Sequence, residues 1–246
     1  MPTAVEITDP LIRTYTRVLP VGPGVCDVCH GAPGTGWERC WSCAQTVGQV
    51  SRPVELVVPI SLTELLGQLH HALRSYKNDG YPTSVRERFR LQVSALLARF
   101  LWRHGDCIRG AAGRDWDAIT IVPSSQGRAG PHPLQEAIQM FAFLDDQYRS
   151  LLGPGPDKAD HNHARDGAYA VTEDVGGLGI LLLDDTFTSG ARAQSAASVL
   201  QLAGAQVVAV VPIGRVIKRE FSDESAALLD RAGEEPFDFD VCCLEG

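Results

Sequence analysis

Continuous apolar runs mark three strands in the second half of the chain. They are the segments WDAITIVP (116–123), GILLLDD (179–185) and QVVAVVPIG (206–214). Strands that are apolar at every position are buried on both faces, as in a parallel sheet between two layers of helices. The weaker segments QVSRPVELVVPI (49–60) and AYAVTED (168–174) predict a linking strand and a short strand.

Apolar residues at helical spacing predict helices around these strands. Two helices begin with capping boxes, Ser61 with Glu64 and Ser84 with Glu87, in which a hydroxyl and a carboxylate bind the first backbone N–H groups. Helices that alternate with buried strands indicate an α/β fold, a mainly parallel sheet with helices on both faces. The predicted helices cover residues 62–76, 85–101, 134–148, 191–204 and 223–233.

Three further segments lack a periodic pattern. Residues 1–22 are expected to form an irregular leader, and residues 153–167 a long polar loop. This loop is either a lid over a site or a surface excursion without a role. The final segment, FDFDVCCLEG, contains Cys242 and Cys243, which are either a redox pair or apolar residues of a last strand.

Paired cysteines distinguish the N-terminal part of the chain. Cys26 with Cys29, and Cys40 with Cys43, form two C-x-x-C motifs in a segment rich in glycine and proline. This segment has too few apolar residues to fold without a cross-link or a metal. Two C-x-x-C knuckles can deliver four thiolates to one structural Zn²⁺; an iron–sulfur cluster and a redox pair are the alternatives.

The cysteine motifs divide the chain into a small zinc-ribbon-like module, residues 1–50, and a main domain, residues 51–246. Trp37 and Trp41 flank the second knuckle. We expect them to pack beside the metal, with stacking on nucleic-acid bases as the alternative.

Charge and hydropathy limit the environment of the protein. The 246 residues carry a net charge of −8, which provides no overall electrostatic footprint for nucleic acid. No apolar run reaches the ~18 residues of a membrane span, and the N-terminus lacks the pattern of a signal peptide. The sequence therefore predicts a cytoplasmic protein that does not enter a membrane.

The segment GILLLDDTFTSGARAQSAA (179–197) carries the candidate chemistry. A buried strand runs into Asp184 and Asp185, and a polar turn from Thr186 to Gly190 leads into a helix. Ligands bind at the carboxyl ends of parallel strands, and a turn that opens a helix offers N–H groups to phosphate. A ribose 5-phosphate satisfies both features; two solvated aspartates before a capped helix are the alternative. Neither a P-loop nor a dinucleotide fingerprint is present in this segment.

ILLLDDTFTSGAR resembles the 5-phosphoribosyl-1-pyrophosphate (PRPP) motif of type I phosphoribosyltransferases. With the cysteine module, the SYKNDG segment and the strand that ends in Val122-Pro123, residues 24–214 resemble ComF-type proteins. The resemblance implies that Asp184 and Asp185 hold the ribose and act in catalysis. It assigns the 5-phosphate to Thr186, Phe187, Thr188, Ser189 and Gly190.

The resemblance also implies a pyrophosphate loop, Mg²⁺ and a nucleobase acceptor. The loop would use Ser124, Ser125 and Arg128, although only one arginine follows this strand where ComF-type chains carry a basic run. A helical hood at about residues 60–105 would select the acceptor. Within it, Lys77 could reach phosphate, but a solvated lysine is the favoured interpretation.

Two functions therefore remain open from the sequence. The first is a Mg²⁺-dependent phosphoribosyltransferase that binds PRPP or a nucleoside 5′-monophosphate and releases pyrophosphate. The second is a non-catalytic PRPP or nucleotide sensor, or a ComF-like factor in DNA uptake or processing that contacts nucleic acid. The sequence does not fix the oligomeric state.

Overall fold

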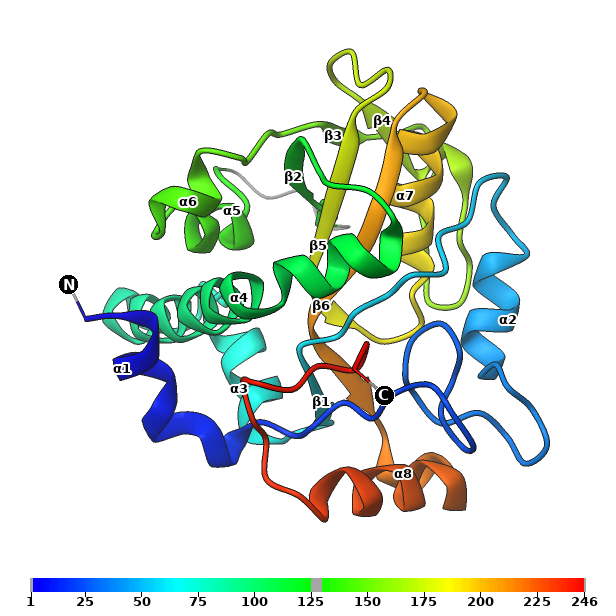
Figure 1. The fold of residues 1–246 in the computed structure, drawn as a ribbon. Coiled ribbons are helices and arrows are strands. Elements are labelled where there is room, and N and C mark those ends of the chain that lie inside the picture. The colour runs from blue at the N-terminus through cyan, green and yellow to red at the C-terminus, as the bar shows by residue number, and fades with distance from the viewer. Residues whose placement is uncertain (1, 125–129, 246) are drawn as a thin grey trace.

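A four-stranded parallel sheet forms the centre of the described chain in a computed structural model (Figure 1), which describes residues 2–124 and 130–245. Its strand order is β1-β6-β5-β2, and every neighbouring pair is parallel. The bounds in this order are Ser61–Glu64, Gln206–Ile217, Gly179–Phe187 and Ala118–Ile121. The three apolar runs thus become β2, β5 and β6, as predicted.

Helices cover both faces of this sheet, so the predicted α/β fold class is confirmed. Helices α3 and α4 pack on one face, and α7 packs on the other. The strands follow this division: Leu181 and Leu183 of β5 are buried with α4, while Ile180 and Leu182 are buried with α7. The helices are α1 (Ala4–Thr8), α2 (Trp41–Val47), α3 (Gln68–Ser75), α4 (Thr83–Ala112), α5 (Pro133–Ile138), α6 (Ala142–Asp145), α7 (Ala191–Leu202) and α8 (Asp223–Gly233).

The predicted helix start at Ser61 is wrong. Residues Ser61–Glu64 form β1, and the Ser61 hydroxyl donates to the carbonyl of Thr16 and does not cap a helix. Pairing with β6 buries this segment and outweighs its local helical pattern, so α3 begins only after Gly67. The preceding segment runs beside β6, where the Val58 N–H donates to Val210. The segment forms an isolated bridge between Val57 and Val210 but no regular strand, so the linking strand expected at 49–60 is not formed as a regular element.

Two other helix predictions need correction. Helix α4 starts at Thr83 without a side-chain cap and runs past the predicted end, as far as Ala112. The predicted helix 134–148 is split into α5 and α6 by Phe141, whose backbone is extended (φ −124°, ψ 116°). After α6 the chain turns to hydrogen-bond with Ile119 at the open edge of β2, which ends the helical pattern.

The two ends of the chain also differ from expectation. The predicted irregular leader contains α1 and a 3-10 helix, Asp9–Thr14, and Thr3 with Glu6 forms a capping box. At the other end, turns replace the predicted last strand, and Cys242 and Cys243 are buried.

The predicted polar loop is partly ordered by local pairing. Strand β3 (Leu152–Pro154) pairs antiparallel with β4 (Tyr169–Val171), in agreement with the short strand predicted there. A 3-10 helix, Asp166–Ala168, lies between them, and another, Arg219–Phe221, follows β6. In the part of the chain that the structure describes, no helix is both long and apolar enough to cross a lipid bilayer.

Candidate functional site

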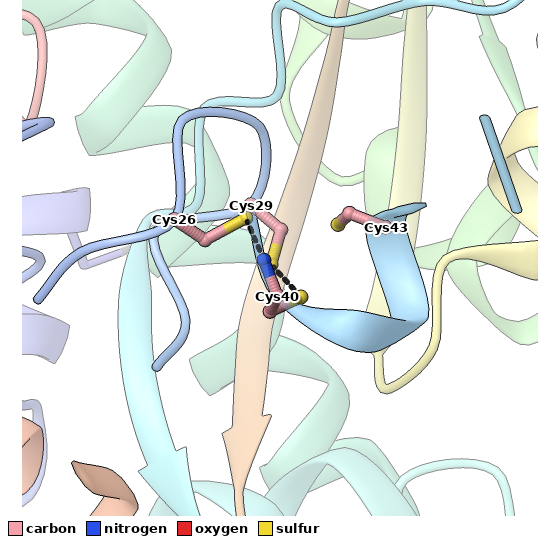
Figure 2. A group of neighbouring side chains, drawn as sticks. All are labelled: Cys26, Cys29, Cys40 and Cys43. Atoms are coloured by element: carbon pink, nitrogen blue, oxygen red, sulfur yellow. Dashed lines mark hydrogen bonds between the residues drawn. The ribbon is translucent and has the colours of Figure 1, made fainter. Parts of the chain in front are cut away.

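The four predicted thiol ligands come together in one buried cluster (Figure 2). Their sulfur atoms lie within 4.8 Å of one another and point toward a common centre. Cys26 and Cys29 come from a loop, whereas Cys40 precedes α2 and Cys43 lies in its first turn. The Sγ atoms of Cys29 and Cys40 are 3.7 Å apart. Tetrahedral Zn²⁺ with Zn–S bonds of about 2.3 Å requires a sulfur separation of about 3.8 Å, so these residues fit a structural zinc ion.

Arg215 joins this cluster to the candidate phosphate turn, and the sequence analysis did not identify it. Its Nε donates to Cys29 Sγ at 3.2 Å, and its Nη1 donates to the carbonyls of Phe187 (3.3 Å) and Thr188 (2.8 Å). The side chain is buried, and hydrogen bonds from Cys26 and Cys43 together with the Arg215 charge lower the pKa of Cys29. An arginine that follows the apolar run QVVAVVPIG was the available sequence signal.

Adjacent carboxylates of β5 point to opposite faces of the sheet, as neighbouring strand residues do. Asp184 lines a pocket on the α7 face. Asp185 faces α3, where its Oδ2 accepts hydrogen bonds from the Tyr76 hydroxyl (2.6 Å) and from Lys77 Nζ (2.7 Å). The expectation of a solvated lysine is therefore wrong: Lys77 forms an ion pair with a buried carboxylate.

The two carboxyl groups differ in acidity because their surroundings differ. Burial raises the pKa of Asp184 to about 6, and the negative charge of Asp185 adds to this shift. Burial also opposes ionisation of Asp185, but the Lys77 charge and the two hydrogen bonds lower its pKa. One aspartate is thus held ionised, while the other titrates just below neutral pH.

The turn after β5 leads directly into α7. Gly190 precedes α7 with φ +81°, and a Cβ there would lie 2.4 Å from the Phe187 ring. Glycine is therefore required, because the Phe187 side chain is buried directly beneath the turn. Phe187 does not line the pocket, whereas Thr186, Thr188 and Ser189 do.

The pocket has a volume of about 600 Å³ and lies between β5, the start of α7 and the 153–167 loop. The loop supplies Lys158 and His161 to its lining, and Arg192 comes from α7. The Asn162 N–H donates to Ser189 Oγ at 3.1 Å, so the loop is anchored to the turn. The loop forms a wall of this pocket and is not a detached excursion; a lid function stays a prediction.

The predicted pyrophosphate loop and the two tryptophans are only partly accounted for by the structure. Ser124 lines the pocket, while Ser125 and Arg128 lie outside the described residues. Trp37 and Trp41 are exposed, so their expected packing beside the cysteines is wrong. Their faces are accessible to a partner.

Comparison with models of known protein families and with curated proteins gave no match to this chain. The structure itself shows an α/β fold with a parallel sheet and a cluster of four cysteines that can hold zinc. The geometry of the pocket has to carry any assignment of function.

Proposed function

We propose that this protein binds PRPP or a nucleoside 5′-monophosphate in the pocket beside β5 and transfers the phosphoribosyl group to an acceptor. It would be a phosphoribosyltransferase of ComF type, with zinc as a structural ion. One observation carries the proposal: a pocket of about 600 Å³ joins Asp184 to the turn at the start of α7. That volume is in the range of small-molecule sites.

The 5-phosphate would bind where the chain enters α7. This helix has 12 residues, and its first backbone N–H groups and its dipole favour an anion. Thr188 and Ser189 add hydroxyl groups to the same part of the pocket, and Lys158 and Arg192 add positive charge. The pocket residues and the N-terminus of α7 thus both favour a phosphate group.

Asp184 would accept hydrogen bonds from the ribose hydroxyls. Asp185 would act through its contacts with Tyr76 and Lys77, because these hold α3 against the carboxyl end of β5. Both aspartates therefore have roles at the site, but only Asp184 is proposed to touch the ligand.

Cleavage of the bond from ribose C1 to the pyrophosphate oxygen builds positive charge on the sugar and negative charge on the leaving group. Bound Mg²⁺ would supply charge that stabilises the pyrophosphate. The oxygen-rich lining and the buried Asp184 carboxylate suit this hard cation. The protein would contribute by orienting the ribose and by placing Ser124 near the leaving group.

Calorimetric titration of PRPP with Mg²⁺ tests the pocket. We expect wild type to bind and Asp184→Asn to lose at least tenfold in affinity, since the amide is a weaker acceptor for hydroxyl donors. Asp106→Asn is the matched control, because Asp106 is fully exposed on α4. Failure of folded, zinc-loaded wild type to bind PRPP would contradict the proposal.

A pyrophosphate-release assay with a set of nucleobases then separates the two candidate activities. Release with one base identifies a transferase and its acceptor. Binding without release from any base would overturn the transferase assignment and favour the sensor. The sensor would use the same pocket without turnover.

A further inference from the structure

A second group of metal-binding side chains lies far from the N-terminal cysteines. His104 and Cys107 are one turn apart on α4, and Cys242 and Glu245 have the same spacing near the end of the described chain. One ligand atom from each residue lies within 4.8 Å of those of the other three. Two chain segments separated by more than a hundred residues therefore meet at four donor atoms.

Direct contacts already join the members of this group. Cys107 Sγ donates to Glu245 Oε1 at 3.0 Å and lies 3.7 Å from His104 Nδ1. The backbone N–H of Cys242 donates to the other carboxylate oxygen of Glu245 at 3.2 Å. These contacts hold both the thiol and the carboxylate toward the same point.

The orientation of His104 supports a ligand role. Its Nε2 lies 2.8 Å from the carbonyl oxygen of Phe239, which can only accept a hydrogen bond. The ring proton is therefore on Nε2, and the lone pair of Nδ1 faces Cys107. A histidine held in this way by an outer carbonyl is the usual arrangement for a metal ligand.

We propose that His104, Cys107, Cys242 and Glu245 bind a second structural Zn²⁺ ion. One nitrogen, two sulfurs and one carboxylate oxygen form a four-ligand set that Zn²⁺ accepts in tetrahedral geometry. Binding forms one Zn–N, two Zn–S and one Zn–O bond, and the two thiol protons pass to solvent. Since all four positions are occupied by protein, the ion has no open site for catalysis.

The proposed ion would fasten the C-terminal segment to α4. Phe237 and Phe239 of this segment pack around Tyr15 in the main core, and Cys243 is buried beside the group. The segment has no strand or helix after α8 in the described residues. Metal ligation would thus stabilise this segment, which lacks the backbone hydrogen bonds of a helix or strand.

Zinc counting tests this proposal. Reduced protein is loaded with Zn²⁺ and freed of excess metal. The number of zinc ions bound per chain is then measured by elemental mass spectrometry. We expect two ions per chain in wild type and one in Cys107→Ser/Cys242→Ser. Cys243→Ala is the matched control and should keep both, because Cys243 is a buried neighbour outside the ligand set. Two ions in the double variant would overturn the proposal.

A measurement on wild type keeps the test independent of variant folding. Cys107 is half-buried, so an alkylating reagent should modify it in metal-free protein. Zn²⁺ should reduce this modification at least tenfold. Equal modification with and without Zn²⁺, or a Cys107–Cys242 disulfide in protein purified without reductant, would contradict the metal site.

Discussion

At the scale of single residues, the adjacent aspartates of β5 show how one strand can hold two different carboxyl groups. Asp185 has a cation and a hydroxyl as partners, whereas Asp184 faces the pocket. The doublet in the sequence indicated a ligand site but could not separate these roles. Strand alternation separates them once β5 is known to continue to Phe187.

Asp184→Asn is expected to stabilise the protein while it weakens ligand binding. The raised pKa of Asp184 means that the folded protein binds this proton more tightly than the unfolded chain, whose carboxyl titrates near 4. The protonated Asp184 carboxyl thus stabilises the folded protein at low pH, and this stabilisation is lost as pH rises through about 6. Asparagine has no ionised form, so the variant should gain about 1–3 kcal/mol at pH 8.

Urea unfolding at two pH values measures this effect. The gain should be clear at pH 8 and should vanish below about pH 3, where wild-type Asp184 is protonated in both states. Asp106→Asn, at a fully exposed position, should show no such difference. A gain of equal size at both pH values would refute the assigned cause.

At the scale of elements, Arg215 connects β6, the cysteine loop and the turn after β5. It donates to Cys29 Sγ and to two carbonyls of the turn. Gly31 lies so close that a Cβ there would be 2.6 Å from the Arg215 guanidinium. The cysteine cluster and the candidate phosphate site therefore share one side chain.

Arg215→Met should destabilise the fold and weaken PRPP binding together. Loss of the buried guanidinium leaves the Cys29 sulfur and the carbonyls of Phe187 and Thr188 without their hydrogen-bond donor. This should lower the free energy of unfolding by about 3–5 kcal/mol. Arg215→Lys keeps the charge but cannot reach all three acceptors in a fixed geometry. This variant should therefore lose less stability and less PRPP affinity than Arg215→Met. Urea unfolding and PRPP titration measure both effects.

Arg219→Met serves as control because Arg219 is a half-buried arginine just after the same strand that pairs with Asp230 and Glu64 at the surface. It should change stability by less than about 1 kcal/mol. Equal losses of stability and PRPP affinity in the Arg215 and Arg219 variants would show that the buried contacts of Arg215 do not stabilise the turn.

At the scale of the whole molecule, the cysteines belong to the same hydrophobic cluster as the α7 face of the sheet. Cys26 and Cys43 are buried with Ile180, Phe187 and Ala193. The boundary predicted near residue 50 remains a prediction, but this shared cluster links the four cysteines to the main sheet.

Removal of zinc should therefore lower the melting temperature of the whole protein. If zinc is present at a thousandfold excess over its dissociation constant, its loss removes about 4 kcal/mol, or about 10 °C for a chain of this size. Calorimetry with and without a chelator measures the shift. A separate low-temperature transition with an unchanged main transition would instead show that the cysteine module unfolds alone.

Local sequence patterns determined most of the elements and the two chemical motifs. Continuous apolar runs predicted β2, β5 and β6, because strands buried on both faces must be apolar throughout. Likewise, C-x-x-C spacing predicted a thiol cluster, since the two knuckles each fix a pair of ligands locally. The turn before α7 was recognisable for the same reason: its residues are consecutive.

Only the tertiary structure decided which distant residues meet. Pairing with β6 turned Ser61–Glu64 into a strand against its helical pattern, because inter-strand hydrogen bonds and burial outweigh local capping. The contacts of Asp185 with Lys77, of Arg215 with Cys29, and of Cys107 with Glu245 join residues more than a hundred positions apart. No local pattern encodes such contacts, because they depend on how the helices and strands pack around the sheet.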